Sequence, residues 1–132
     1  YPDLDFTGAH LGSLEWSVDE LAKRFDSFRN FRADISARIF HLQLQSQKDY
    51  EKVRNFMIRY QDRLIYGTDG EVHDTPGAET GAICKNLENG WYRQWLYFAT
   101  DSTVNNIRGL RLPAKVIDKL YFENASRYFA GK

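Results

Sequence analysis

The chain has 132 residues, 42% of them hydrophobic and 15% aromatic, which is enough for one folded domain with a buried core. Its 18 Lys and Arg residues balance 18 Asp and Glu residues, and the two signs are interleaved along the sequence. This composition argues against a disordered chain, and the charge balance gives no electrostatic support for a nucleic-acid partner or an acidic membrane surface.

The sequence has no feature of a secreted or membrane-anchored chain. Its single cysteine, Cys84, has no intramolecular disulfide partner. No apolar run approaches the roughly 20 residues that cross a bilayer, and no signal peptide is visible. A cytoplasmic location fits these features. Because Tyr1 and Pro2 open the sequence without an initiator methionine, we expect it to be a piece of a longer protein.

The first half of the chain predicts strands that alternate with helices. Short β-favouring segments lie at 5–10, 31–36 and 63–68. A helix should follow the first of them, because Ser17 and Glu20 have the spacing of a capping box. The apolar stripe of this helix consists of Val18, Leu21, Phe25 and Phe28. After the second strand, a connection through 40–47 should lead to a helix at about 48–60, whose stripe consists of Tyr50, Val53, Met57 and Tyr60.

The second half predicts a long loop and two helices. Residues 70–90 contain glycines and a proline with weak periodicity, which is typical of a loop. Aromatic residues then recur at helical spacing over 91–98. Pro113 fits the first position of a last helix, which should break near Asn124 before a short turn that reaches Phe129.

The strand-helix repeat predicts an α/β fold with parallel strands. The three strands begin about 30 residues apart, which is close to the length of one unit of a (β/α)8 barrel. Strands separated by helices run parallel, and their crossovers are right-handed. Three strands cannot close a barrel, which needs about eight. We therefore interpret residues 1–132 as the C-terminal part of one barrel domain, with about three βα units and closing helices.

Two residues have suitable chemistry at the carboxyl ends of predicted strands, where barrel enzymes place their catalytic groups. His10 ends the first strand and Asp69 ends the third, and both have glycines nearby that allow the backbone to turn. An imidazole and a carboxylate at one mouth can bind a divalent metal, polarise a water molecule and move its proton. The alternative is a hydrogen-bonded structural histidine and an ordinary Gly-Thr-Asp turn.

Other candidates have less support from their spacing. His41 fits a packed or partly exposed residue, or one at the rim of a site. His73 with Asp69, Glu71 and Asp74 lacks a fixed metal-ligand spacing, which favours a solvated loop. Asp34 faces either the mouth or a polar layer inside a barrel. The aromatic residues at 91–95 are more typical of helix packing than of a substrate platform: Trp91, Tyr92 and Trp95. Cys84 lies in the predicted loop without a paired histidine, so a thiol nucleophile is not expected.

Three runs of the sequence, in the correct order, resemble one family. The run YPDLDFTGAHLG at 1–12 is similar to the sixth-strand region of amidohydrolase-related proteins, the metal-dependent hydrolases that include the aminocarboxymuconate-semialdehyde decarboxylases. Their pattern there is tyrosine-proline, an apolar strand and His-x-Gly. The run YQDRLIYGTD at 60–69 is similar to their eighth strand, which ends in Gly-Thr-Asp. Residues 112–127 resemble their closing helix.

The resemblance implies a (β/α)8 barrel with a divalent metal, usually zinc, at its mouth. Asp69 would then ligate the metal or accept a proton from metal-bound water. His10 would act mainly as acid or base, as in the decarboxylase-like branch, or reach the metal, as elsewhere in the family. The family's His-x-His pair and its fifth-strand histidine would lie before Tyr1. Because a protein zinc site generally needs three or more ligands, this chain alone would bind zinc weakly or not at all and be inactive.

The expected function is a metal-dependent hydrolase in which activated water attacks an amide, ester or lactone of a small molecule. The runner-up is a non-oxidative decarboxylase of the same superfamily. An alternative of a different class is a structural or binding module that acts alone. A three-stranded parallel sheet would leave its edges unpaired, so we expect self-association or pairing with the missing N-terminal part.

Overall fold

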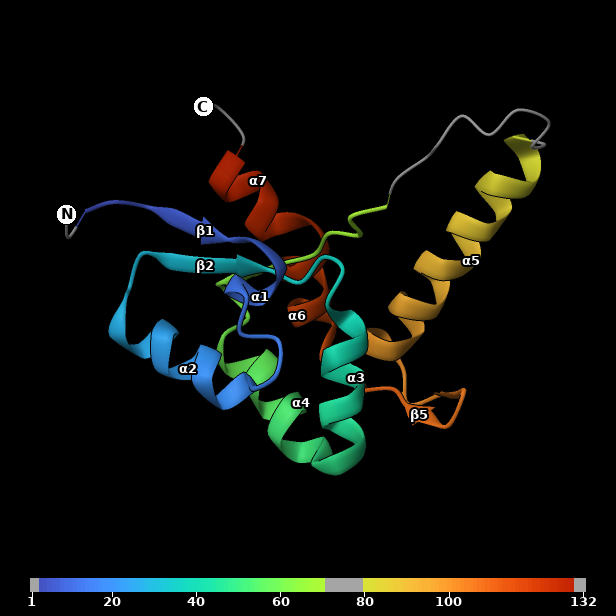
Figure 1. The fold of residues 1–132 in the computed structure, drawn as a ribbon, viewed down its shortest axis with the longest axis horizontal. Coiled ribbons are helices and arrows are strands. Elements are labelled where there is room, and N and C mark those ends of the chain that lie inside the picture. The colour runs from blue at the N-terminus through green and yellow to red at the C-terminus, as the bar shows by residue number, and fades with distance from the viewer. Residues whose placement is uncertain (1–2, 71–79, 130–132) are drawn as a thin grey trace.

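The structure, a computed structural model, describes residues 3–70 and 80–129. The chain forms a parallel sheet in the order β1-β2-β3, and Figure 1 shows β1 and β2 side by side. Its strands are β1 (Phe6–Gly8), β2 (Phe31–Asp34) and β3 (Leu64–Ile65). The register pairs Phe6 with Phe31 and Ala33 with Leu64. The predicted parallel α/β arrangement is therefore confirmed, although each strand is shorter than the sequence pattern indicates.

The first crossover contains a short helix and a regular one. Helix α1 (Ala9–Gly12) follows β1 directly, and α2 (Val18–Ser27) begins at Ser17, whose Oγ accepts a hydrogen bond from the Glu20 backbone N at 3.3 Å. The predicted cap is thus confirmed. Three members of the predicted stripe are buried: Val18, Leu21 and Phe25. Phe28 is exposed, because the helix ends at Ser27 and the chain turns into an extended conformation there.

The second crossover contains two helices, and the predicted connection at 40–47 is wrong. Helix α3 (Ile39–Lys48) occupies it, and α4 (Tyr50–Arg59) follows after a single residue. Asp49 separates the two helices, since its side chain accepts a hydrogen bond from the Lys52 backbone N at 3.1 Å and caps α4. Helix α3 buries only Ile39, Leu42 and Ser46. Because much of its sequence is glutamine, it shows little of the apolar periodicity that would have predicted a helix.

The predicted loop at 70–90 is wrong for its second part. Helix α5 (Thr80–Ala99) begins inside it and includes the predicted helix at 91–98, while 71–79 lies outside the described residues. Gly81 and Gly90 are accommodated in α5, where a Cβ would meet no atom within 4 Å. Only Tyr97 and Phe98 of this helix are buried, and α5 projects away from the rest of the molecule (Figure 1).

The C-terminal segment contains a hairpin that the sequence pattern does not indicate, and then a continuous helical stretch. Strands β4 (Thr103–Val104) and β5 (Ile107–Arg108) pair antiparallel. Helix α6 (Ala114–Asp118) begins after Pro113, and the π-helix η1 (Lys119–Glu123) leads into α7 (Asn124–Phe129). The predicted break near Asn124 is wrong. Asn124 is buried, and its Nδ2 donates to the carbonyl oxygens of Gln61 and Leu64 at 2.6 and 2.8 Å.

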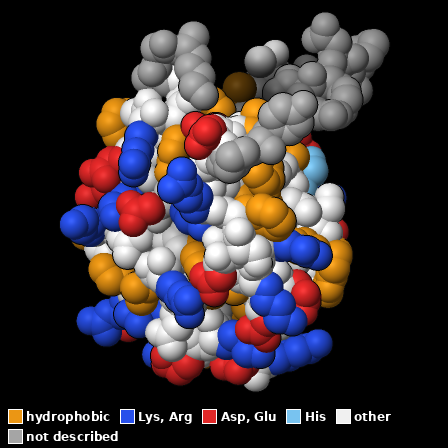
Figure 2. All heavy atoms as spheres, turned by 90° about the vertical axis from the view of Figure 1, so that its left-hand side faces the viewer, with side chains coloured by type: hydrophobic (Ala, Val, Ile, Leu, Met, Phe, Trp, Pro, Cys, Tyr) orange, Lys and Arg blue, Asp and Glu red, His pale blue; other side chains and the backbone are white. Residues whose placement is uncertain are grey.

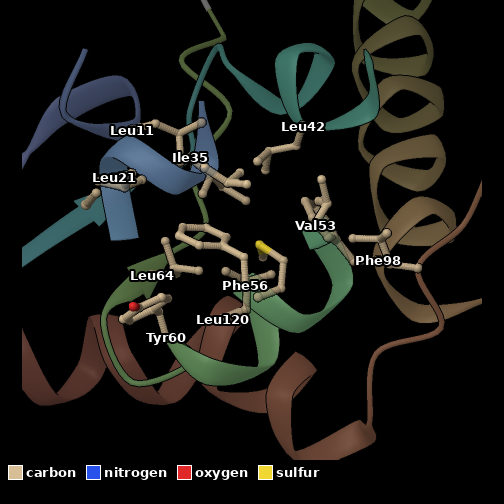
Figure 3. Close-up of a cluster of buried hydrophobic side chains, with 14 of the residues drawn as sticks. Leu11, Leu21, Ile35, Leu42, Val53, Phe56, Tyr60, Leu64, Phe98 and Leu120 are labelled. Atoms are coloured by element: carbon tan, nitrogen blue, oxygen red, sulfur yellow. The ribbon is translucent and has the colours of Figure 1, made fainter. Parts of the chain in front are cut away.

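The hydrophobic core lies between one face of the sheet and helices α2, α4 and η1. Figure 3 shows this cluster, with Phe56 of α4 close to Leu64 of β3 and Leu120 of η1. Alternate residues of β2 point the other way, and on that face Tyr128 of α7 covers Arg32. Among the described residues, no helix is both long and apolar enough to cross a bilayer. The sheet is thus covered unequally, with the main core on one side.

Candidate functional site

The structure brings His10 and Asp69 together at the carboxyl edge of the sheet. The Nε2 atom of His10 lies 3.8 Å from Oδ2 of Asp69. The His10 side chain is 31% exposed and that of Asp69 is 56% exposed, so both are accessible to a small molecule. Residues 59 positions apart in the sequence therefore present an imidazole and a carboxylate to the same region of solvent. We call His10 and Asp69 the carboxyl-edge pair.

Left-handed backbone conformations put this pair in place. His10 and Asp69 have φ angles of 55° and 54°, and Leu11 and Gly12 continue the left-handed turn after β1. Such angles are costly for residues other than glycine and persist where the surrounding structure holds them. Gly8 acts through close packing, because a Cβ there would lie 2.8 Å from the Gly12 Cα. The sequence pattern indicates that nearby glycines make these turns. In the structure, the two candidate residues themselves also adopt the strained left-handed conformation.

Asp34 fastens the end of β1 to the end of β2. Its Oδ1 accepts hydrogen bonds from the backbone N of His10 and the backbone N of Ser36, each at 3.0 Å. The Ser36 hydroxyl also donates to this oxygen. The structure thus places Asp34 at the carboxyl edge, beside the carboxyl-edge pair, and resolves the two orientations left open by the sequence. Asp34 holds the strained turn that contains His10.

The ring of His10 is oriented by a backbone carbonyl. Its Nδ1 lies 3.0 Å from the Ser36 carbonyl oxygen and 3.4 Å from Ser36 Oγ. Because a carbonyl oxygen only accepts, this contact places a hydrogen on Nδ1. The Nε2 side of the ring then faces Asp69. Histidines that ligate metals or exchange protons are commonly oriented in this way through their other nitrogen.

Ser36 is a functional candidate that the sequence reasoning missed. It lies two residues after Asp34 at the end of β2, so the position of the strand end is the signal that could have identified it. Its hydroxyl donates to Asp34 and not to His10. His10 is therefore not placed to take a proton from this serine. Ser36 is therefore a positioning residue, which connects Asp34 to the His10 ring.

Tyrosines connect the strand that carries Asp69 to the C-terminal helices. The Tyr66 hydroxyl donates to Oε1 of Gln94 in α5 at 2.6 Å, and its ring stacks on Tyr121 with centroids 4.1 Å apart. The Tyr66 backbone N donates to the Leu120 carbonyl oxygen at 2.8 Å. Burial raises the pKa of the Tyr66 hydroxyl, so it stays a neutral donor. These contacts fix the chain just before Gly67, Thr68 and Asp69.

The other sequence candidates do not join the carboxyl-edge pair. His41 lies on α3 and makes an edge contact with Phe40, at a centroid distance of 6.1 Å. His73, Glu71 and Asp74 lie outside the described residues. The aromatic residues of α5 were expected to pack and are instead exposed: Trp91, Tyr92 and Trp95. Cys84 is exposed too, but on helix α5 and not on a loop.

The donor atoms of the carboxyl-edge pair fit two positions of a zinc site but do not complete one. An imidazole nitrogen and an exposed carboxylate are both ordinary zinc ligands. The described residues contain no group of three or more His, Cys, Asp or Glu side chains placed to hold a metal ion. A full set of ligands would therefore require donors from outside the described residues.

Comparison with known proteins identifies no relative of this chain. No family model, no curated protein and no solved structure matches it. The chemistry of the site is therefore inferred from its own residues.

Proposed function

We propose that this chain is the C-terminal section of a (β/α)8 metal-dependent hydrolase of the amidohydrolase-related type, and that His10 and Asp69 are half of its active site. The observation that carries the proposal is the His10 Nε2 atom, 3.8 Å from Asp69 Oδ2 at the carboxyl edge of a parallel sheet. That edge is where barrel enzymes hold their catalytic groups. The resemblance of residues 1–12 and 60–69 to the sixth and eighth strands of that family supports the same assignment.

The two side chains are suited to handle protons beside an electrophilic carbon. Zinc, when bound by such a site, polarises a water molecule and stabilises negative charge on a carbonyl oxygen. Asp69, exposed and next to the imidazole, can accept a proton from an attacking water. Where Asp69 and not His10 holds the metal, the His10 Nε2 atom can take up that proton and deliver it to a leaving group. The proposed substrate is a small molecule with an amide, ester or lactone bond.

The proposal requires partners for the open edge of the sheet. Strand β1 pairs only with β2 in the part of the chain that the structure describes, and Phe6, on this edge, is 41% exposed. A cavity of about 490 Å³ runs along the same edge and is lined largely by Phe6, Leu14, Phe28 and Phe31. We infer that further barrel strands cover this edge and contribute the remaining zinc ligands. A cytoplasmic enzyme of small metabolites is consistent with the neutral charge of the chain.

Zinc titration of the chain, followed through the ring resonances of its histidines by NMR, tests the half-site. We expect Zn²⁺ to shift the His10 Nε2 signals with weak affinity and to leave Nδ1 bonded to the Ser36 carbonyl oxygen. Asp69→Asn should weaken this binding by about tenfold, since it removes a charged ligand. The control is His41→Gln, which removes the histidine of α3.

The two variants distinguish a half-site from a nonspecific metal contact. The proposal predicts that His41→Gln leaves the His10 shifts unchanged. If zinc leaves the His10 signals unmoved, or if Asp69→Asn binds zinc as well as the unmodified chain does, the zinc half-site is wrong.

A further inference from the structure

A polar cavity lies at the other end of the sheet from the carboxyl-edge pair, where the strands begin. It has a volume of about 350 Å³, and four arginines line it together with Asp5 and Tyr128. The arginines are Arg29, Arg32, Arg63 and Arg127. We call this cavity the arginine cavity. Figure 2 shows this end of the molecule, where Lys and Arg side chains are mixed with Asp and Glu side chains.

Two of the arginines form a fixed floor. The Arg32 side chain is only 7% exposed, its Nη2 lies 2.9 Å from Asp5 Oδ1, and its guanidinium stacks on the Tyr128 ring at 3.8 Å. Arg63 donates from Nε to the Phe31 carbonyl oxygen at 2.7 Å and from Nη1 to the Phe25 carbonyl oxygen at 2.6 Å. Its Nη2 donates to the Phe28 and Phe31 carbonyl oxygens, so Arg63 contributes positive charge to the cavity and not free donors. Burial lowers the pKa of Arg63, which is the effect of a cation held away from water. The floor is therefore preorganised.

The other two arginines are free to adjust. Arg29 contacts Asp3 at 3.7 Å, and both of these side chains are largely exposed, so the pair is weak. Arg127 is exposed, and its guanidinium lies 5.5 Å from the centre of the Tyr128 ring. No described carboxylate lies within ion-pair distance of Arg63 or Arg127. Buried guanidinium groups on the floor and exposed ones at the rim are suited to surrounding an anion.

The charge of this cavity differs from that of the whole chain. The chain is neutral, yet four guanidinium groups and a single carboxylate line this one cavity. Arginine remains protonated in proteins, so the excess cannot be relieved by losing protons. Its planar group of donors matches the oxygens of phosphate in a bidentate way, and more negative charge is concentrated on a phosphate than on a carboxylate.

We propose that the arginine cavity binds a phosphate-bearing small molecule. Arg32 and Arg63 supply fixed positive charge from the floor of this site, and the exposed Arg29 and Arg127 donate to the phosphate oxygens at its rim. The proposal does not rest on the hydrolase assignment, because the cavity lies at the amino ends of the strands and the carboxyl-edge pair at their carboxyl ends.

Isothermal titration of the full chain with inorganic pyrophosphate, at low ionic strength, tests the site. We expect saturable binding to one site that weakens as salt is added. Arg127→Gln and Arg29→Gln should each weaken it by about tenfold, the loss of one charge-assisted hydrogen bond. Both residues are exposed, so neither substitution should disturb the fold. Arg93→Gln, an exposed arginine on α5, is the matched control and should leave the affinity unchanged.

A second arm of the titration uses citrate, which carries carboxylates in place of phosphates. Pyrophosphate should bind more tightly than citrate. Absence of saturable pyrophosphate binding, tighter binding of citrate, or an equal loss of affinity in Arg93→Gln and Arg127→Gln would overturn the proposal.

Discussion

Asp34 is the residue on which the geometry of the carboxyl edge depends most. One carboxylate oxygen accepts three hydrogen bonds, and through them it holds both the His10 backbone and Ser36. Asp34→Ala should therefore destabilise the fold by about 2 kcal/mol, because bonds to a charged group are lost in a partly buried place. Asp34→Asn keeps an acceptor oxygen and should cost less. Urea unfolding measures both changes.

The control for Asp34 is an exposed aspartate in a surface ion pair. Asp101 contacts Arg111 at 3.4 Å, and both side chains are mostly exposed. Asp101→Ala should change the stability by less than about 1 kcal/mol. If it costs as much as Asp34→Ala, then Asp34 has no special role in holding the turn.

At this scale, the sequence indicates the two candidate side chains but not how they are held. The position of His10 and Asp69 at strand ends follows from the strand-helix repeat, because parallel strands present their carboxyl ends at one edge. Ser36 has no signal beyond its place after Asp34. The left-handed angles at His10 and Asp69 could not be predicted, since neighbouring glycines offered cheaper turns.

At the scale of elements, two tyrosines join the C-terminal helices to the core in different ways. The Tyr97 hydroxyl of α5 donates to Ser46 Oγ at 3.1 Å, whereas the Tyr121 hydroxyl of η1 is buried without a hydrogen-bond partner among the described residues. Tyr97→Phe should therefore destabilise the fold by about 1 kcal/mol, and Tyr121→Phe should be neutral or stabilising by up to about 1 kcal/mol. Equal losses in urea unfolding would contradict this distinction.

The same tyrosines should make the folded chain less stable at alkaline pH. Burial raises the pKa of both phenols well above the ordinary value of 10.0. The folded chain then holds these protons more tightly than the unfolded chain. The stabilisation is present in full below about pH 10 and is lost as the pH rises through the raised pKa values. In Tyr97→Phe and Tyr121→Phe the free energy of unfolding should fall less steeply above about pH 10. An unchanged slope in both variants would contradict this assignment.

Elements with a strong apolar stripe follow the sequence, and those without one do not. Helices α2 and α4 match their predicted positions because Val18, Leu21, Val53 and Met57 are buried at helical spacing. Helix α3 was missed because glutamines occupy much of it, and the first part of α5 was missed because it buries little and contains two glycines. Asn124 indicated a helix end, but its amide instead connects α7 to Leu64 of β3.

At the scale of the whole molecule, the open edge of β1 predicts self-association. An exposed strand edge with apolar side chains favours pairing with another chain. Sedimentation velocity should show association that increases with protein concentration. Phe6→Lys places a charge on this edge and should shift the chain toward the monomer, whereas Phe122→Lys, at a residue that is 70% exposed on η1, should not. A monomer at all concentrations would contradict the account of the edge.

Net charge and charge distribution are separate properties of this molecule. The sequence is neutral, and nothing in the order of its residues indicates that four arginines meet at the start of the strands. They come from the turn before β2, from β2 itself, from the turn before β3 and from α7, and only the parallel topology brings these segments together. The fold class could be predicted from the repeat, but this juxtaposition could not.

The most direct test of the central claim is the zinc content and hydrolase activity of this chain joined to the sequence encoded upstream of it. If His10 and Asp69 are half of a zinc hydrolase site, the extended protein should bind zinc tightly and hydrolyse esters or lactones. Asp69→Asn should then abolish the activity and release the metal. An extended protein that stays free of zinc and inactive, or one that Asp69→Asn leaves unchanged, would contradict the account.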